Sequence, residues 1–261
     1  MRNASRAMLA AVALACAPCV LAQTSVGTGR TIVFPVVAQT GSYATEVTLY
    51  NPNGEALVAN VAFYEANNST TPGPKVCTGV NVPANRSLQF TLGDKCTLSA
   101  GSHFGLLIVT DTAAPPGTPF YGYTRVQNPQ GIGFSIEGFP AGNFNSQTSH
   151  AIGLKRQAAA PTYQTNCFVA SLEKSLNWEL RLYDDTTGAQ IGGVVGGSIG
   201  NYSQWRILDV FGDNGVHAPA GDRYNVRAEF IAVNGSEMIG FCTVQDNTSF
   251  GADFRIAKNP G

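Results

Sequence analysis

The chain has 261 residues, and its 16 lysines and arginines nearly balance its 17 aspartates and glutamates, giving a formal net charge of −1. This balance excludes a strongly basic nucleic-acid-binding protein, in which lysine and arginine would dominate. Charged residues make up 13% of the chain, well below the roughly 25% usual in soluble domains, but the hydrophobic content of 44% is enough to form a core. The length favours one or two domains.

Residues 1–22 have the three-part pattern of a secretory signal peptide. Two arginines precede a short apolar run over residues 7–17, and Val20 and Ala22 occupy the −3 and −1 positions before Gln23. The apolar run is too short to span a bilayer, and no later run reaches the roughly 20 residues of a membrane helix. We therefore expect cleavage before Gln23 and export to the periplasm, the cell surface or the medium, with no membrane span.

Four cysteines follow the predicted cleavage site: Cys77, Cys96, Cys167 and Cys242. An even number of cysteines in an exported chain favours disulfide bonds. Of the three connectivities, we expect Cys77–Cys96 and Cys167–Cys242, because each pair then lies within one half of the chain. A zinc site is the competing interpretation, but these residues lack the close pairing of cysteines or histidines that zinc sites use. No metal site is therefore expected.

Short patterns recur along the chain at a spacing of 118–120 residues and in the same order. Tyr43-Ala44-Thr45 recurs as Tyr163-Gln164-Thr165, and Gly122-Tyr123 recurs as Gly240-Phe241. Such order-preserving similarity indicates an internal duplication. We expect two homologous units, residues 23–140 and 150–261, joined by a polar linker over residues 141–149.

Within each unit the apolar residues alternate with polar ones, as in half-buried strands. The alternation is visible in residues 47–50, 58–64 and 88–92 of the first unit, and in residues 179–183 and 227–231 of the second. Turn residues separate these segments, and no helical period persists for ten residues after the signal peptide. The sequence therefore predicts an all-β protein with two tandem antiparallel β-sandwiches of immunoglobulin-like or jelly-roll-like strand order.

Three segments, VTLYNPNGEALVANVAFYE, GLKRQAAAPTYQTNCF and GFCTVQDNTSFGADFRIAK, resemble those of uncharacterised bacterial exported proteins of tandem, immunoglobulin-like β-sandwich type. The resemblance covers most of the mature chain and implies the fold, but it implies no activity and no functional residues. The chain is also similar to periplasmic pilus chaperones, which carry two immunoglobulin-like domains behind a signal peptide. This second resemblance implies a chaperone-like role as an alternative.

Three aromatic residues of the second unit, Trp178, Trp205 and Tyr202, are candidate ligand-binding residues. Exposed aromatic rings can stack on the apolar face of a sugar, so these side chains could form a glycan-binding platform. The alternative is that they fill the core of the second unit or cover a sheet edge.

A G-x-S-x-G pattern surrounds Ser198, and Asp209 or Asp213 and then His217 follow it in the order of a serine hydrolase triad. The nucleophile of such an enzyme stands between a strand and a helix, whereas the residues on both sides of Ser198 are strand-like. We interpret the pattern as a glycine-rich turn. The three histidines lie in separate segments, so we expect no buried pair of histidine and carboxylate.

These observations favour a secreted or cell-surface protein without catalytic activity or cofactor, with a structural or adhesive role. Its partners would be other surface proteins or polysaccharide. The alternatives are a glycan-binding module that uses the second-unit aromatics, a periplasmic chaperone-like protein, and a serine hydrolase based on Ser198.

Overall fold

The computed structural model describes residues 27–66, 73–113, 119–157, 162–249 and 251–259. In this part the regular secondary structure is almost entirely antiparallel β-strand, which confirms the all-β prediction. None of its helices is long and apolar enough to cross a membrane. The predicted signal peptide, residues 1–22, lies outside the described residues.

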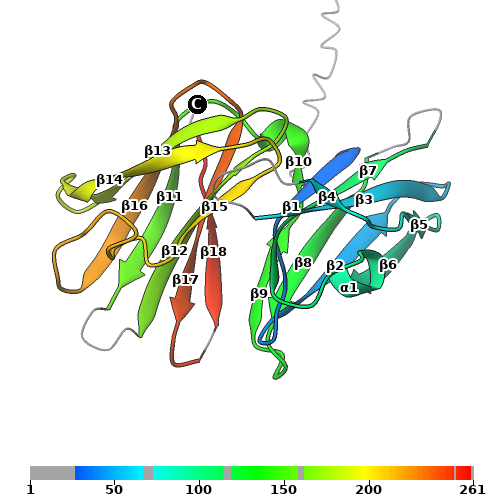
Figure 1. Ribbon diagram of the computed structural model, residues 1–261, viewed down its shortest axis with the longest axis horizontal. Helices are drawn as coiled ribbons and strands as arrows, with labels where there is room; N and C mark the ends of the chain where they lie inside the picture. Colours follow the sequence, from blue (N-terminus) through cyan, green and yellow to red (C-terminus); the bar gives the residue numbers. More distant parts are fainter. Residues whose placement is uncertain (1–26, 67–72, 114–118, 158–161, 250, 260–261) are drawn as a thin grey trace, which may run out of the picture.

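The first half of the chain contains ten strands: β1 (Thr31–Gln39), β2 (Ala44–Asn51), β3 (Leu57–Glu65), β4 (Pro74–Lys75), β5 (Val80–Val82), β6 (Arg86–Thr91), β7 (His103–Asp111), β8 (Tyr121–Gln127), β9 (Gly133–Glu137) and β10 (Phe139–Pro140). The short helix α1 (Leu92–Lys95) follows β6, and the 3-10 turn η1 (Ala141–Asn143) follows β10. The second half contains β11 (Ser149–Arg156), β12 (Tyr163–Ser171), β13 (Leu176–Asp184), β14 (Gln190–Ile199), β15 (Gln204–Ile207), β16 (Arg223–Ala232), β17 (Met238–Asp246) and β18 (Ala252–Ile256). Figure 1 shows the two halves side by side.

The same order of strand pairing occurs in both halves. In the second half the sheets are β14-β13-β16-β11 and β15-β12-β17-β18. In the first half the corresponding strand orders are β3-β7-β1 and β6-β2-β8-β9. One residue pair, Gln39 with Ala44, joins these two layers of the first half into a single sheet.

This strand order differs from that of an immunoglobulin constant domain. There the first strand pairs with the second, and the seventh pairs with the sixth. Here the first strand of the second half, β11, pairs with the sixth strand, β16, and the seventh strand, β17, pairs with the second, β12. The sandwich architecture is therefore present with a strand order other than the immunoglobulin one.

Alternating burial explains how each sandwich forms its core. In β3 and in the corresponding β13, every second residue is buried while the residues between them are exposed or half-buried: Leu57, Ala59, Val61 and Phe63 in β3, and Leu176, Trp178, Leu180 and Leu182 in β13. Because side chains of a strand alternate between the two faces, one face of each strand lies in the core. Each half has a hydrophobic cluster of its own.

Both predicted disulfides are present. Cys77 is bonded to Cys96, where α1 ends, and Cys167 of β12 is bonded to Cys242 of β17. The pairing within each half is therefore confirmed.

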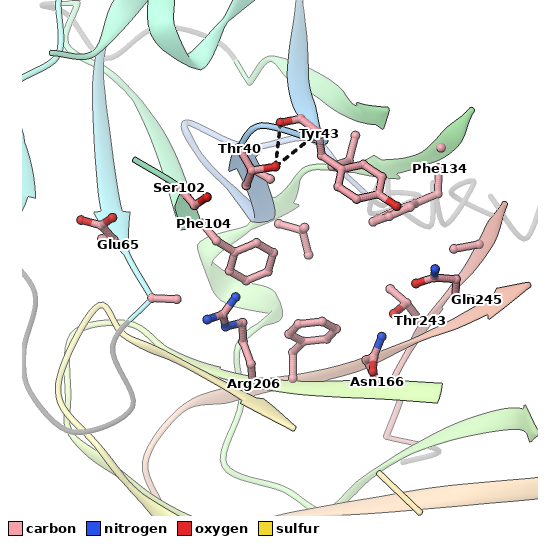
Figure 2. Close-up of a pocket in the computed structure, with 17 residues that line it drawn as sticks. Thr40, Tyr43, Glu65, Ser102, Phe104, Phe134, Asn166, Arg206, Thr243 and Gln245 are labelled. Carbon is pink, nitrogen blue, oxygen red and sulfur yellow. Dashed lines mark hydrogen bonds between the residues drawn. The ribbon is translucent and has the colours of Figure 1, made fainter. Parts of the chain in front are cut away.

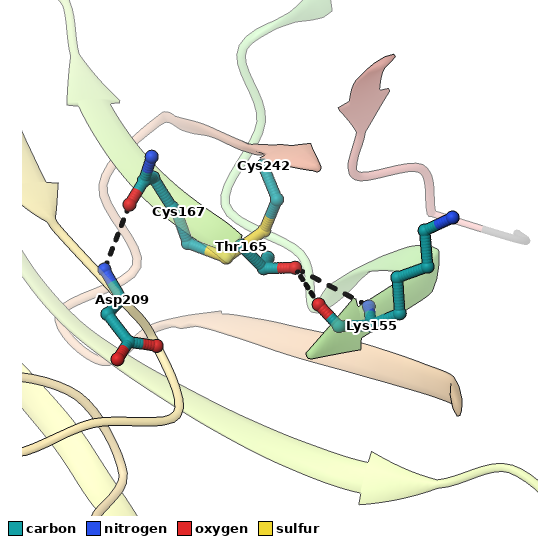
Figure 3. Close-up of a disulfide and its surroundings, with 6 residues drawn as sticks. Lys155, Thr165, Cys167, Asp209 and Cys242 are labelled. Atoms are coloured by element: carbon teal, nitrogen blue, oxygen red, sulfur yellow. Dashed lines mark hydrogen bonds between the residues drawn. A yellow bond between two sulfur atoms is a disulfide. The ribbon is translucent and has the colours of Figure 1, made fainter. Parts of the chain in front are cut away.

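The disulfide of the second half replaces a packed pair of the first. Cys167 lies directly opposite Cys242, and at the same place in the first half Val47 of β2 lies opposite Thr124 of β8. Beside the disulfide, the Thr165 hydroxyl donates a hydrogen bond of 2.7 Å to the Lys155 carbonyl of the facing sheet (Figure 3). The corresponding Thr45 hydroxyl accepts a 2.7 Å hydrogen bond from the Ala38 amide.

Candidate functional site

Four strands are buried on both of their faces, β1 and β7 in the first half and β12 and β17 in the second. Every residue of β1 from Ile32 to Ala38 is buried, as is every residue of β17 from Met238 to Val244. A strand with one face in a sandwich core would be buried at every second residue only. The outer faces of these strands are therefore covered by another part of the molecule.

The two halves cover one another with these outer faces. The hydrophobic cluster between them includes Val33, Leu106 and Ile108 from the first half and Phe168, Ile239 and Phe241 from the second. Aromatic rings continue across it: the ring centroids of Phe104 and Phe168 lie 5.8 Å apart, and those of Phe168 and Phe241 lie 4.9 Å apart. The contact between the halves is thus packed in the same way as a domain core.

Tyr202, one of the predicted ligand-binding residues, belongs to this contact. Its backbone has a φ of 52°, in the left-handed region, and its ring stacks on Tyr64 of the first half with the centroids 4.8 Å apart. Burial raises the pKa of the Tyr202 hydroxyl, and the nearby Glu173 charge adds to the effect. Tyr202 therefore packs against the first half of the chain and is only partly exposed to solvent.

A cleft of about 340 Å³ opens beside the interface, with walls from both halves (Figure 2). The first half contributes Thr40, Tyr43, Glu65, Phe104 and Phe134 among others. The second half contributes Asn166, Phe168, Arg206, Thr243 and Gln245. We call this space the central cleft.

The second-half wall of the central cleft combines a cation, an amide and an aromatic ring. Arg206 of β15 lies directly opposite Phe168 of β12, and Asn166 is two residues from Phe168 on the same strand. The Arg206 guanidinium carbon lies 4.9 Å from the centre of the Phe104 ring across the cleft. Such stacking holds the guanidinium against an apolar surface while its N–H groups stay available.

The first-half wall carries an ionised network. The Glu65 carboxylate accepts a hydrogen bond of 2.8 Å from Lys75 and lies 2.7 Å from Nδ1 of His103. The other ring nitrogen of His103, Nε2, donates a hydrogen bond of 2.9 Å to the Ser99 carbonyl. Partial burial opposes ionisation of Glu65, but the hydrogen bonds from Lys75 and His103 outweigh it and lower the pKa of the carboxyl. Of this pair only His103 is buried, at 4% exposed, whereas the Glu65 side chain is 33% exposed, so the histidine and the carboxylate do not form a fully buried pair.

The predicted aromatic platform is not formed. Trp178 is 1% exposed and points into the core of the second half, where its ring lies 5.7 Å from that of the half-buried Trp205. A buried indole cannot stack on a sugar. With Tyr202 on the contact between halves, the three residues do not share an exposed surface, and the core-filling alternative holds for Trp178.

The Ser198 pattern lies within a strand, not between a strand and a helix. Ser198 is in β14 and donates a 2.7 Å hydrogen bond to the Asn177 side chain. The Val216 carbonyl accepts a hydrogen bond from the Gly193 amide, and His217 is the next residue after Val216. Gly193 lies five residues before Ser198 on β14, which corresponds to about 16 Å at the usual rise per residue. The serine and the histidine of the hypothetical triad are therefore not brought together.

Within the described residues, no group of three or more histidine, cysteine, aspartate or glutamate side chains could hold a metal ion. Comparison of the chain with protein-family models, with curated proteins and with solved structures finds no match. The candidate site therefore rests on the geometry of the central cleft.

Proposed function

We propose that the chain is an exported bacterial protein without catalytic activity, in which two β-sandwiches form one rigid unit with a structural or adhesive role. The observation that carries this proposal is the contact between the halves. Aromatic rings and aliphatic side chains from both halves pack there as in a core. A large apolar interface holds domains in a fixed relation, whereas small polar interfaces allow relative motion.

The disulfides support the export step of this proposal. Each half contains one cystine, and disulfides persist in the periplasm and outside the cell but are rare in a reducing cytosol. With the signal-peptide pattern of residues 1–22, they favour an extracytoplasmic location.

Cell fractionation combined with thiol labelling tests the location. The protein should be recovered from the periplasm, cell surface or medium, should begin at Gln23, and should react with a maleimide reagent only after reduction. Recovery from the cytoplasm with four reactive thiols would contradict the proposal.

Glycan binding remains a second candidate, at a surface other than the predicted one. The outer face of β8 carries Tyr121 and Tyr123, which are 44% and 43% exposed, and the ring of Tyr50 on β2 lies 5.2 Å from that of Tyr121. Exposed tyrosines on a flat sheet can stack on sugar rings. Retention on insoluble polysaccharides should fall in Tyr121→Ala with Tyr123→Ala and be unchanged in Trp205→Ala. Equal retention of both variants excludes this surface.

A further inference from the structure

The central cleft has the size of a site for a small organic ligand. Ligand sites in proteins usually begin at roughly 300 Å³, and the cleft measures about 340 Å³. An engineered apolar cavity of about 150 Å³ binds one benzene molecule. The central cleft therefore has room for one aromatic ring with a short chain attached.

Aromatic side chains supply the apolar part of the cleft. Phe104, Phe134 and Tyr43 come from the first half, and Phe168 comes from the second. Figure 2 shows Phe104 and Phe134 on different sides of the space. Rings in this arrangement can contact an apolar ligand body on more than one side, which favours an aromatic or similarly flat group.

Two hydrogen-bond donors stand beside these rings. In the described part of the chain no carboxylate forms an ion pair with Arg206. The Asn166 carbonyl oxygen accepts from the Gln164 side chain at 3.1 Å and from the Asp209 amide at 2.9 Å. These two bonds orient the Asn166 amide group, and its nitrogen points toward the cleft (Figure 2).

The charge of the cleft favours an anion. Glu65 is the acidic side chain in the wall, and Lys75 and His103 already bind its carboxylate. Arg206 lines the cleft as an exposed residue, and within the described part of the chain no carboxylate neutralises its charge. An arginine in such a position binds carboxylates well, since its planar N–H groups match the two oxygens.

We propose that the central cleft binds a small organic carboxylate with an aromatic body, with the carboxylate on Arg206 and Asn166 and the ring among Phe104, Phe134 and Phe168. The site is formed only when the two halves are packed together. This role goes beyond the structural function proposed above and does not depend on it.

Calorimetric titration of the mature, oxidised protein with benzoate, phenylacetate and 4-phenylbutyrate tests the proposal. At least one acid should bind with a Kd below about 1 mM, and the corresponding alcohol, which lacks the charge, should bind at least tenfold more weakly. Binding of acid and alcohol with equal affinity, or no binding of any of the three acids, would overturn the proposal.

Two substitutions locate the carboxylate. Arg206→Gln removes the positive charge. In Asn166→Asp one carboxylate oxygen keeps the hydrogen bonds from the Gln164 side chain and the Asp209 amide, and the other oxygen replaces the nitrogen that faces the cleft. Each should weaken acid binding at least tenfold and leave the weak alcohol binding unchanged. Arg255→Gln is the matched control, because Arg255 is an exposed arginine paired with Asp253. If Arg255→Gln weakens binding as much as Arg206→Gln does, the acid binds by general charge attraction and the proposed site is wrong.

Discussion

The two halves use the same sheet in opposite ways. In the first half the outer face of β2 and β8 carries Thr48 opposite Tyr123, and Tyr123 is 43% exposed. In the second half the same register of β12 and β17 carries Phe168 opposite Phe241, and Phe241 is fully buried against the first half. The order of strand pairing is the same in both cases, so the side chains on the outer face, and not the scaffold, decide which sheet becomes an interface.

The largest expected effect comes from exchanging the disulfide of the second half for the corresponding pair of the first. Cys167→Val with Cys242→Thr removes a cross-link between residues 75 positions apart, which should cost about 4.5 kcal/mol in the free energy of unfolding by loop-closure entropy. Guanidinium unfolding under non-reducing conditions measures the loss.

The reverse exchange, Val47→Cys with Thr124→Cys, should stabilise the first half, because the two positions lie directly opposite one another on β2 and β8. A loss of stability in the first exchange without a gain in the reverse exchange would show that the two sites are not equivalent.

A smaller effect is expected from the outer faces themselves. Phe241→Ala removes a ring from the contact between the halves and should cost about 3–4 kcal/mol, the usual price of a buried phenylalanine. Tyr123→Ala removes the corresponding exposed ring and should change stability by less than about 0.5 kcal/mol. Equal losses in urea unfolding would mean that the exposed face is also covered in solution.

The smallest expected effect is a pH dependence of stability that arises from Glu65 in the first-half wall of the central cleft. Glu65 has a lowered pKa in the folded protein, so its contribution to stability is complete above the unfolded pKa of about 4.3 and is lost as the pH falls through the folded value. The melting temperature should fall between about pH 5 and pH 3, and less steeply in Glu65→Gln.

Lys75→Met should reduce this pH dependence in the same way, because Lys75 donates to the Glu65 carboxylate. The corresponding Asp184 of the second half provides the comparison. The backbone amides of Thr187 and Thr186 lower its pKa, so its contribution should persist when Lys75 is replaced. A Lys75→Met protein that melts with the wild-type pH profile would contradict this account.

Much of the fold could be predicted from the sequence, because alternation, turn residues and the 118–120 spacing are local or repeated signals. The disulfides were predicted for the same reason, since each pair lies within one repeat. The contact between the halves was missed, although it leaves a signal. Residues 32–38, 106–109 and 238–244 are apolar or small with little alternation, a pattern typical of strands buried on both faces.

The candidate site was harder to predict. His103 and Glu65 are 38 residues apart in sequence, and Phe104 and Arg206 come from different halves, so only the packing of the halves brings them together. Trp178 was a wrong candidate because the alternation of a strand does not show which of its two faces lies in the core. A tryptophan in such a strand has the same sequence pattern whether its side chain faces the core or solvent. Only the register of β13 against β16 places it inside.

The doubly buried strands have a consequence for how the chain reaches its folded state. Residues 149–256 provide the strands that cover the outer faces of β1 and β7. Until the second half has folded, the apolar outer face of β1 and β7 lacks its native cover, so a chain in which only the first half has folded exposes a surface that favours aggregation.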